Sequence, residues 1–214
     1  MESSREPFQQ ALLGIMKIDI SDTYGLKTKR PAPFFYIGGQ CGVIYNLRCL
    51  DLHIQNNSRI SLPLVDEVAT VSFAARLALG IKPGMVIYLH GDLGTGKTTL
   101  VRALLHAMGY IGRVKSPTYT LLELYQAGGL HLCHFDLYRF HDADEWNDAG
   151  FRDEFDGRNV CLVEWPEKAQ DLLPQADVEI TLKILSTETM SNGRNIEVRA
   201  ISQTGRKCLE VLQS

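Results

Sequence analysis

The sequence predicts an α/β fold in which a mostly parallel sheet is flanked by helices and antiparallel strands form the C-terminal end. Two near-continuous apolar runs, "MVIYLH" at 85–90 and "NVCLVEW" at 159–165, are typical of parallel strands buried on both faces. Segments with the spacing of apolar residues that is typical of helices lie next to these runs in the sequence. The tail instead alternates apolar and polar residues in "DVEITLKIL" and "NIEVRAI", which is typical of antiparallel strands with one solvated face.

The length of 214 residues suits one domain with an appendage. Residues 1–58 mix proline, glycine, basic and aromatic residues without a sustained period, and we expect them to form a poorly ordered N-terminal extension. A docking arm is the alternative reading of this segment. Within it "GVIYNLRCLDLHI" could make a strand, but no partner strand is obvious. Residues 59–214 are predicted to form the folded domain.

Composition narrows the class of protein and its location. The net charge of -3 argues against a dedicated nucleic-acid surface, which usually carries a basic excess. No apolar run reaches the roughly 18 residues that span a bilayer, and the N-terminus lacks the order of a signal peptide. The five cysteines show no C-x-x-C spacing, so we expect reduced thiols. These features predict a cytoplasmic protein without membrane contact.

The first predicted elements surround a glycine-rich loop. A helix is expected up to Gly80, with an apolar stripe formed by Leu64, Val68, Val71, Ala75 and Leu79. "KPG" then turns the chain into the strand at 85–90. The loop 91–96 follows, and the helix "KTTLVRALLHAMG" is expected to stop at Gly109.

A hairpin is predicted next. "TYTLLELYQ" and "LHLCHFDLY" are patterned as strands on either side of the turn "AGG". Alternation along the second strand sends His131 and Cys133 to one face and His134 to the other. This arrangement argues against a structural zinc site made from the three side chains.

The remaining elements complete the α/β pattern. "ADEWNDAGFRDEF" is expected to be a polar, helical connection, and it leads into the strand that ends at Glu164. "EKAQDLLP" is predicted to be a short helix stopped by Pro174. The two alternating tail strands then flank the turn "SNG".

The loop 91–96 and the start of the next helix satisfy the phosphate-binding pattern G-x-x-x-x-G-K-S/T. Glycines allow backbone N–H groups to wrap phosphates, and the helix presents its positive N-terminal end to them. The lysine would neutralise the β- and γ-phosphates, and the threonine hydroxyl would bind Mg²⁺. The strand before and the helix after the loop support a true P-loop. The predicted nucleotide-binding residues are Gly91, Asp92, Leu93, Gly94, Thr95, Gly96, Lys97, Thr98 and Thr99.

Two acidic residues are candidates for the metal shell and for polarising the attacking water. Asp136 and Glu164 each end an apolar strand, and ligands of α/β proteins bind at the carboxyl ends of strands. An ordinary exposed strand-end acid is the competing interpretation of each. Glu164 is the candidate metal ligand beside Thr98, because its strand ends as a Walker-B strand does. Spacing alone does not decide which acid contacts the metal shell and which polarises water.

Two further residues are candidates by position. In "KSPTYTL" the proline rigidifies the approach to Thr118, whose hydroxyl could reach the γ-phosphate or Mg²⁺ as a switch threonine does. Trp165 follows Glu164 directly and would lie close to the phosphates, although tryptophans are more often core residues.

These motifs together resemble the bacterial TsaE (YjeE-type) family. The resemblance rests on "GDLGTGKTTLVRALLHAMG", "VKSPTYTLLELY", "HFDLYRF" and "VCLVEWPEKAQDLLP", in that order, and covers roughly residues 61–203. Thr95 stands where the family typically has alanine, a position that contributes only backbone. The first 60 residues have no counterpart in the resemblance.

The resemblance implies an ATPase of tRNA threonylcarbamoyladenosine biosynthesis. Such a protein binds ATP and Mg²⁺, works with the partners TsaB and TsaD, and meets tRNA only through their complex. Lys97 and Thr98 then carry over as phosphate and Mg²⁺ residues and Thr118 as the switch threonine. Asp136, Glu164 and Trp165 carry over as residues needed around the nucleotide.

Two other functions stay open at this point. A small-molecule kinase of the P-loop class would need an acceptor pocket, and the chain shows no arginine-rich lid of the nucleotide-kinase type. A regulatory module would bind nucleotide without turnover, which the intact Lys97, Thr98 and Glu164 argue against. A GTPase is disfavoured because no N-K-x-D motif is present.

Overall fold

The computed structural model describes residues 34–37, 40–43, 53–56, 58–185 and 193–213, the first three ranges as backbone only. Most of the predicted N-terminal extension lies outside the described residues. Among them the strands are β1 (Phe34–Ile37), β2 (Gln40–Val43), β3 (His53–Asn56), β4 (Arg59–Leu64), β5 (Val86–His90), β6 (Leu122–Ala127), β7 (Leu130–Asp136), β8 (Val160–Glu164), β9 (Val178–Ile184) and β10 (Arg194–Ala200). The helices are α3 (Glu67–Gly80), α4 (Lys97–Ala107), α5 (Ala143–Asp148) and α6 (Gln203–Gln213), with the 3₁₀ helices η2 (Phe151–Glu154) and η3 (Pro166–Lys168).

Eight strands form one mixed sheet, in the order β3-β4-β10-β9-β5-β8-β7-β6. Its centre is parallel, because β5 pairs in parallel with both β8 and β9, and β7 pairs in parallel with β8. Antiparallel strands flank this centre on both sides. The α/β class predicted from the sequence is thus confirmed, including the antiparallel pair β9–β10 near the C-terminal end.

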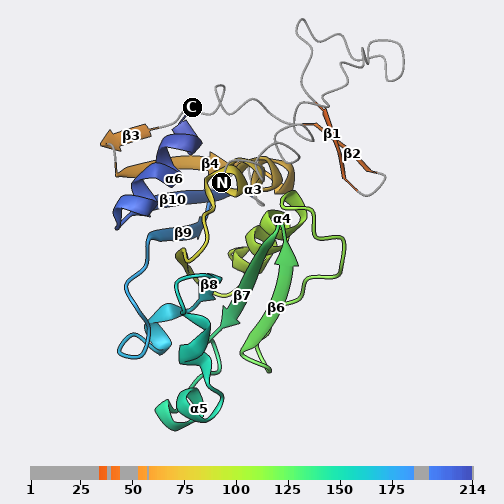
Figure 1. The fold of residues 1–214 in the computed structure, drawn as a ribbon. Helices are drawn as coiled ribbons and strands as arrows, with labels where there is room; N and C mark the ends of the chain where they lie inside the picture. The colour runs from red at the N-terminus through yellow and green to blue at the C-terminus, as the bar shows by residue number, and fades with distance from the viewer. Residues whose placement is uncertain (1–33, 38–39, 44–52, 57, 186–192, 214) are drawn as a thin grey trace, which may run out of the picture.

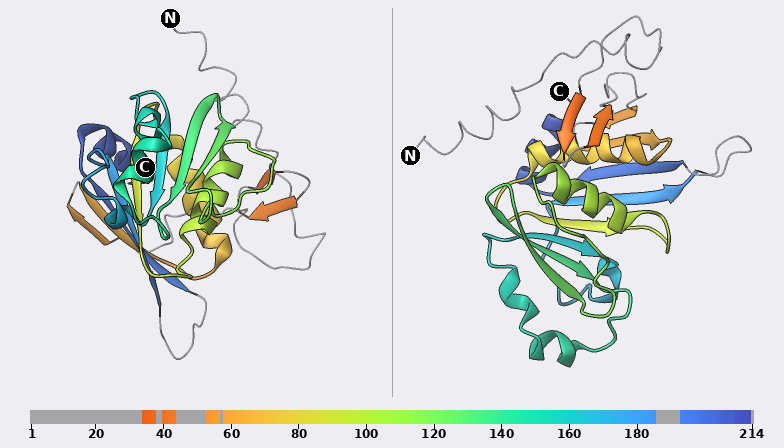
Figure 2. Two further views of the ribbon diagram at one scale, coloured as in Figure 1. Left: turned by 90° about the horizontal axis from the view of Figure 1, so that it is seen from below. Right: turned by 90° about the vertical axis from the view of Figure 1, so that its right-hand side faces the viewer.

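Helices cover both faces of the sheet (Figures 1 and 2). On one face α3 packs against α4 and α6, and their apolar residues join one face of the strands in the larger hydrophobic core. On the other face α5 and η2 cover a smaller core, in which Trp146 and Phe135 stack with their ring centroids 5.9 Å apart. Strand β8 is therefore buried along its whole length and β5 along most of it, as their continuous apolar sequences predict.

The parallel centre fixes where strand ends meet. In the register of β7 with β8, Asp136 stands opposite Glu164. In the register of β5 with β8, Leu89 stands opposite Glu164, so the glycine-rich loop starts two residues beyond this row. The carboxyl ends of β5, β7 and β8 consequently share one edge, which is where α/β proteins place their ligands.

The first predicted helix differs from the structure in three respects. The predicted stripe of the first helix is wrong: Val68, Val71 and Leu79 are exposed, and α3 instead buries a face that includes Phe73 and Leu77. Leu64 belongs to β4, whose alternating burial makes it a strand despite Pro63. The helix begins later, where the Asp66 carboxylate accepts a hydrogen bond from the backbone of Ala69 at 2.7 Å.

Further differences lie toward the C-terminus. The short helix predicted in "EKAQDLLP" is reduced to the single 3₁₀ turn η3. The polar connection is helical as expected, but it is split into α5 and η2 at Gly150. Helix α6 was not predicted, although Cys208, Leu209 and Leu212 have helical spacing and are buried.

The described chain contains no helix that is both long enough and apolar enough to cross a bilayer.

Candidate nucleotide-binding site

The glycine-rich loop leaves β5 at Gly91 and enters α4 at Lys97. Gly91 has a φ of 133°, and an added Cβ would lie 2.3 Å from the carbonyl oxygen of Leu182, so only glycine fits there. Gly96 caps α4 in the left-handed region at a φ of 102°, and no side chain caps the helix. The first N–H groups of α4 are therefore left open to a ligand, which suits an anion.

Lys97 is almost fully buried, at 4% exposure. Its Nζ donates to the carbonyl oxygens of Gly91 at 2.6 Å and Asp92 at 3.0 Å, and it lies 3.9 Å from the centroid of the Trp165 ring. Burial lowers the pKa of Lys97 from its ordinary value, and the negative charge of nearby carboxylates, first that of Glu164, opposes this effect. The loop thus holds the Lys97 ammonium beside the uncapped N-terminus of α4.

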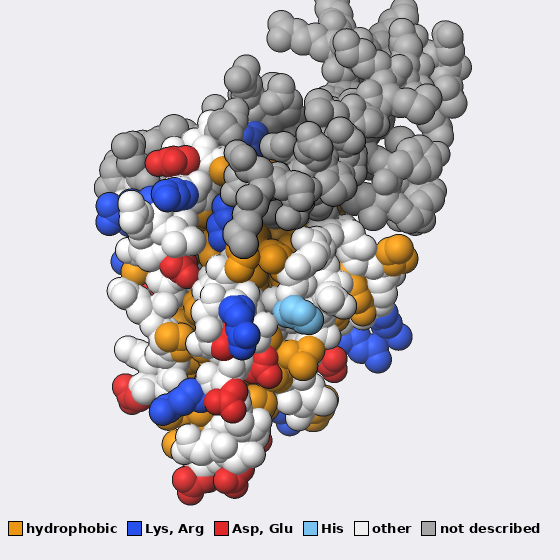
Figure 3. Space-filling view, in the orientation of Figure 1, with side chains coloured by type: hydrophobic (Ala, Val, Ile, Leu, Met, Phe, Trp, Pro, Cys, Tyr) orange, Lys and Arg blue, Asp and Glu red, His pale blue; other side chains and the backbone are white. Residues whose placement is uncertain are grey.

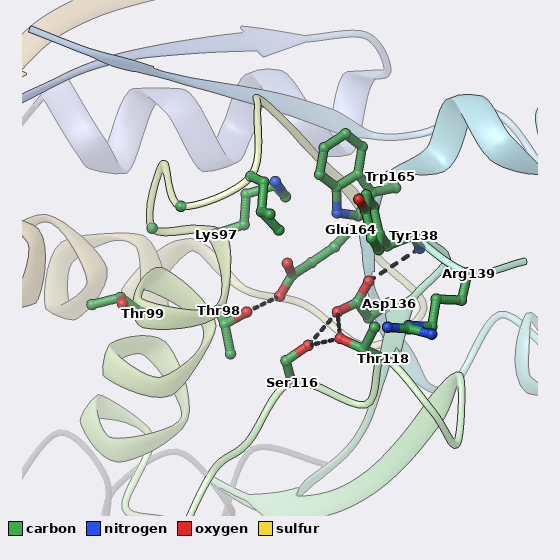
Figure 4. Close-up of a pocket in the computed structure, with 13 residues that line it drawn as sticks. Lys97, Thr98, Thr99, Ser116, Thr118, Asp136, Tyr138, Arg139, Glu164 and Trp165 are labelled. Atoms are coloured by element: carbon green, nitrogen blue, oxygen red, sulfur yellow. Dashed lines mark hydrogen bonds between the residues drawn. The ribbon is translucent and has the colours of Figure 1, made fainter.

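Glu164 ends β8, and its side chain is hydrogen-bonded to the first turn of α4 (Figure 4). The Thr98 hydroxyl donates to Oε1 of Glu164 at 2.8 Å, and the carboxylate is 2% exposed. His134 also contacts Oε1, at 2.9 Å from its Nε2. The two residues predicted to bind metal, Thr98 and Glu164, are therefore adjacent, and their hard oxygen atoms suit Mg²⁺.

Asp136 ends the neighbouring strand β7, and its carboxylate accepts hydrogen bonds from the 116–118 segment. Oδ2 accepts a hydrogen bond from Thr118 at 2.7 Å and another from Ser116, while Oδ1 accepts one from the backbone N–H of Tyr138 at 3.1 Å. The two hydroxyls are 2.6 Å apart. Figure 4 shows this cluster facing Thr98 across the pocket. Asp136 is thus a buried anchor for the 116–118 segment.

Trp165 has an unusual backbone conformation for a residue that is not glycine. Its φ of 58° lies in the left-handed region, which costs on the order of 1 kcal/mol or more and persists where the surroundings require it. The ring lies between the Lys97 ammonium and the ring of Tyr138, whose centroid is 5.1 Å away. The turn after β8 therefore holds the indole against the Lys97 ammonium.

The pocket between these groups has a volume of about 490 Å³. Its lining residues come from the glycine-rich loop, the start of α4, the 116–118 segment and the ends of β7 and β8: Leu93, Gly94, Gly96, Lys97, Thr98, Thr99, Ser116, Thr118, Asp136, Tyr138, Arg139, Glu164 and Trp165. The structure thus brings ten of the predicted site residues to one cavity.

Three predicted site residues stand outside the lining. Gly91 and Asp92 face Lys97 with their carbonyl groups, and the Thr95 hydroxyl is turned back to the Asp92 carbonyl oxygen at 2.8 Å. Thr95 is only 2% exposed. Its side chain serves the loop itself, so any contribution of this position to a ligand comes from the backbone.

Sequence reasoning missed Ser116, Tyr138 and His134. The first two stand beside predicted residues in "SPT" and "DLY", which was the available signal. Arg139, which the "DLYR" motif makes a candidate to reach the γ-phosphate, also lines the pocket, and its guanidinium carbon lies 4.6 Å from the Tyr119 ring centroid. His134 gave no signal beyond its side of the strand, because its partner Glu164 is thirty residues away in the sequence.

Comparisons with known proteins identify the family of this chain. Residues 64–196 match the family model for the threonylcarbamoyl adenosine biosynthesis protein TsaE. A tRNA threonylcarbamoyladenosine biosynthesis protein TsaE from Haemophilus influenzae is 39% identical over 154 residues, covering 70% of this chain and 94% of that protein. One from Bacillus subtilis is 40% identical over 119 residues, covering 56% and 74%.

A solved structure gives the same result for the fold. The crystal structure of Bacillus subtilis YdiB aligns with a TM-score of 0.59 and 31% sequence identity, covering 72% of this chain and 94% of that one. The family model covers the glycine-rich loop, the 116–118 segment and both strand-end acids. The chain therefore belongs to the TsaE family of threonylcarbamoyl adenosine biosynthesis proteins.

Proposed function

We propose that this protein is the ATP-binding and ATP-hydrolysing component of the machinery that makes threonylcarbamoyladenosine in tRNA, and that it drives the turnover or assembly of a complex of TsaB and TsaD. The observation that carries the proposal is the convergence of Lys97, the Thr98–Glu164 pair and Asp136 on one pocket at the uncapped end of α4. A P-loop site needs these groups for phosphate, metal and water.

The described residues fit a nucleotide with Mg²⁺. An added Cβ at Gly94 would meet nothing within 4 Å, so this part of the loop is open to close approach by phosphate oxygens. Lys97 would exchange its two loop carbonyl partners for the phosphates. Thr98 and Glu164 would hold Mg²⁺, which when bound supplies positive charge against the phosphate oxygens.

We assign different roles to Glu164 and Asp136 from their hydrogen-bond partners. Glu164 is bonded to the threonine of the P-loop helix, so we assign it to the metal side of the site. Asp136 is bonded to Ser116 and Thr118, so we assign it to orienting that segment and, through it, the attacking water. Thr118 would contact the γ-phosphate when its hydroxyl leaves Asp136.

The positive charges available for the reaction are few. Arg139 lines the pocket but is exposed and stacked on Tyr119, so it is not fixed over the place where the γ-phosphate would lie. P-loop enzymes that lack a fixed arginine finger hydrolyse slowly, and a finger supplied in trans accelerates them by about 10³–10⁵. Slow hydrolysis that a partner stimulates is therefore the expected behaviour.

Contact with tRNA is expected only through the partners. Figure 3 shows the face that Figure 1 turns to the viewer. On this face lysine and arginine side chains are scattered among acidic ones, and acidic side chains gather at the end where α5 lies. Phosphate neutralisation by clustered basic residues supplies most of the affinity for nucleic acid. A chain with a net charge of -3 and this distribution should bind tRNA weakly by itself.

The test uses ATP labelled in the γ-phosphate, incubated with the protein, Mg²⁺ and a mixture of small cellular metabolites. Inorganic phosphate as the sole labelled product is expected, and Lys97→Ala should abolish its release. A labelled metabolite would instead support the alternative, a small-molecule kinase. Tight binding of ATP without release of phosphate above the Lys97→Ala background would reduce the protein to a regulatory module.

A further inference from the structure

His134 is a fully buried imidazole that lies behind the nucleotide pocket without lining it. The side chain is 0% exposed, and its Nε2 lies 2.9 Å from Oε1 of Glu164. Burial of a polar ring costs free energy unless a hydrogen bond compensates it. Glu164 supplies that hydrogen bond, so the presence of this ring in the core is tied to the carboxylate.

The sheet places the ring where it can act on Glu164. His134 and Asp136 are two residues apart on β7, so their side chains point to the same face of the sheet. Across the parallel register Leu162 stands opposite His134 and Glu164 opposite Asp136. The Glu164 side chain therefore reaches back, diagonally across the two strands, to meet the ring.

The hydrogen-bond inventory fixes which nitrogen donates. Nδ1 of His134 is buried and has no partner among the described residues. An imidazole with its hydrogen on Nε2 donates to Glu164 and leaves only a lone pair at Nδ1. The opposite tautomer would bury an unpaired N–H and face the carboxylate with a lone pair, and both features cost free energy.

Two donors converge on a single oxygen of Glu164. Thr98 Oγ1 donates to Oε1 at 2.8 Å, and His134 Nε2 approaches the same atom at 2.9 Å. Among the described residues Oε2 receives no hydrogen bond from the protein. The carboxylate is thus held by one oxygen and offers the other to the pocket.

We propose that His134 is a positioning residue, which holds Oε1 of Glu164 so that Oε2 faces the site of Mg²⁺ and nucleotide. The inference rests on the proposed function and adds to it a residue outside the pocket lining. Residues that orient the ligands of a metal typically change metal affinity by about 10- to 100-fold when they are replaced. Thr98 would be turned toward Mg²⁺, so the ring is the donor that remains dedicated to the carboxylate.

The test compares two amides at this position. The amide nitrogen of His134→Gln can reach the place of Nε2, whereas that of His134→Asn is one methylene too short. His131→Gln, an exposed position on the same strand, is the matched control. The affinity for ATP is measured by calorimetry in excess EDTA and in excess Mg²⁺, with circular dichroism to verify folding.

The expected result is specific to magnesium. His134→Asn should keep its affinity for ATP in EDTA and lose the tightening by Mg²⁺ by about 10-fold or more, while His134→Gln retains most of it. In a Glu164→Gln background the two amides should behave alike, because the carboxylate they position is gone. Equal magnesium dependence of His134→Asn, His134→Gln and the unmutated protein would overturn the proposal.

A second measurement needs no substitution. In protein labelled with ¹⁵N-histidine, the His134 ring should show the tautomer with hydrogen on Nε2, and its Nε2 resonance should shift on addition of Mg²⁺ and ATP but not of ATP in EDTA. A hydrogen on Nδ1 would refute the role of the ring. If the unmutated protein bound no ATP at all, the proposed function would fail instead. Lys97→Ala distinguishes the two failures, because it should weaken ATP binding in EDTA as well as in Mg²⁺.

Discussion

At the scale of single residues, Lys97 is held by uncharged groups of its own surroundings. Its ammonium group is held by two carbonyl groups of its own loop and by the face of Trp165. Among the residues that the structure describes, no carboxylate forms an ion pair with Lys97, so these contacts compensate its charge. A phosphate that enters the loop can therefore replace neutral partners with an anionic one, and it gains a stronger, charge-assisted hydrogen bond.

Lys97→Ala should weaken ATP binding by about 2–5 kcal/mol, the usual cost of removing one member of a buried charge pair. The free energy of unfolding should change little, because the residue faces a ligand site. Calorimetric titration with ATP measures the effect, and Lys183→Ala, at an exposed position on β9, is the control. An affinity equal to that of the unmutated protein would rule out the phosphate role of Lys97.

The two acids should separate binding from hydrolysis. Asp136→Asn and Glu164→Gln keep the shape of the side chain and remove its charge, so ATP should still bind while Mg²⁺-dependent phosphate release falls by about 100-fold or more. Single-turnover phosphate release measures the loss, and Glu123→Gln on the exposed side of β6 is the control. Normal hydrolysis by either variant would make that acid an ordinary strand end.

At the scale of elements, the sequence predicted the parts whose pattern is local. The strand–loop–helix of 85–109 is marked by its apolar run, its glycines and its stop at Gly109, and the hairpin of β6 and β7 by the turn at Gly128 and Gly129. The strand-end position of Asp136 and Glu164 followed from the same reasoning. Their approach to each other follows from the parallel pairing of β7 and β8.

The missed parts depend on contacts between distant segments. The buried face of α3 includes Thr70 and Ser72, which a hydrophobic stripe does not detect, and it was fixed by packing against α4 and α6. Helix α6 carries Gly205 in its first turns, a residue that lowers the propensity for a helix. The glycine is explained by its close packing against the backbone of Asp177, the residue directly before β9.

Gly205→Ala tests this explanation. Alanine is favoured over glycine in a helix by about 1 kcal/mol, so propensity alone predicts stabilisation. An added Cβ would, however, lie 2.0 Å from the carbonyl oxygen of Asp177, and such overlap with backbone forces shifts that cost about 1–3 kcal/mol. We expect net destabilisation in urea unfolding, with Lys207→Ala on the exposed side of α6 as the control. A more stable variant would mean that α6 can move away from Asp177 freely.

At the scale of the whole molecule, the fold brings the candidate site residues together at one edge of the sheet. The glycine-rich loop, Glu164 and the 116–118 segment converge on one pocket, whereas Arg139, which also lines it, is exposed and stacked on Tyr119, itself 83% exposed. Leu93, in the loop, is 70% exposed beside the same pocket. The mouth of the pocket therefore combines exposed apolar side chains with an exposed positive charge.

This arrangement predicts that hydrolysis depends on partners. We expect slow phosphate release by the chain alone, little change with TsaB or TsaD singly, and stimulation when both are present, up to the roughly 10³–10⁵ that a correctly placed arginine can provide. The measurement is phosphate release in the four mixtures, with Arg139→Lys tested in each.

If Arg139 is the group that the partners order, Arg139→Lys should lower the stimulated rate and leave the slow rate unchanged, because lysine cannot reproduce the planar guanidinium. If the partners supply an arginine of their own, Arg139→Lys should be stimulated normally. Equal rates in all four mixtures, together with tight binding of tRNA by the isolated chain, would contradict both the partner dependence and the indirect role of tRNA.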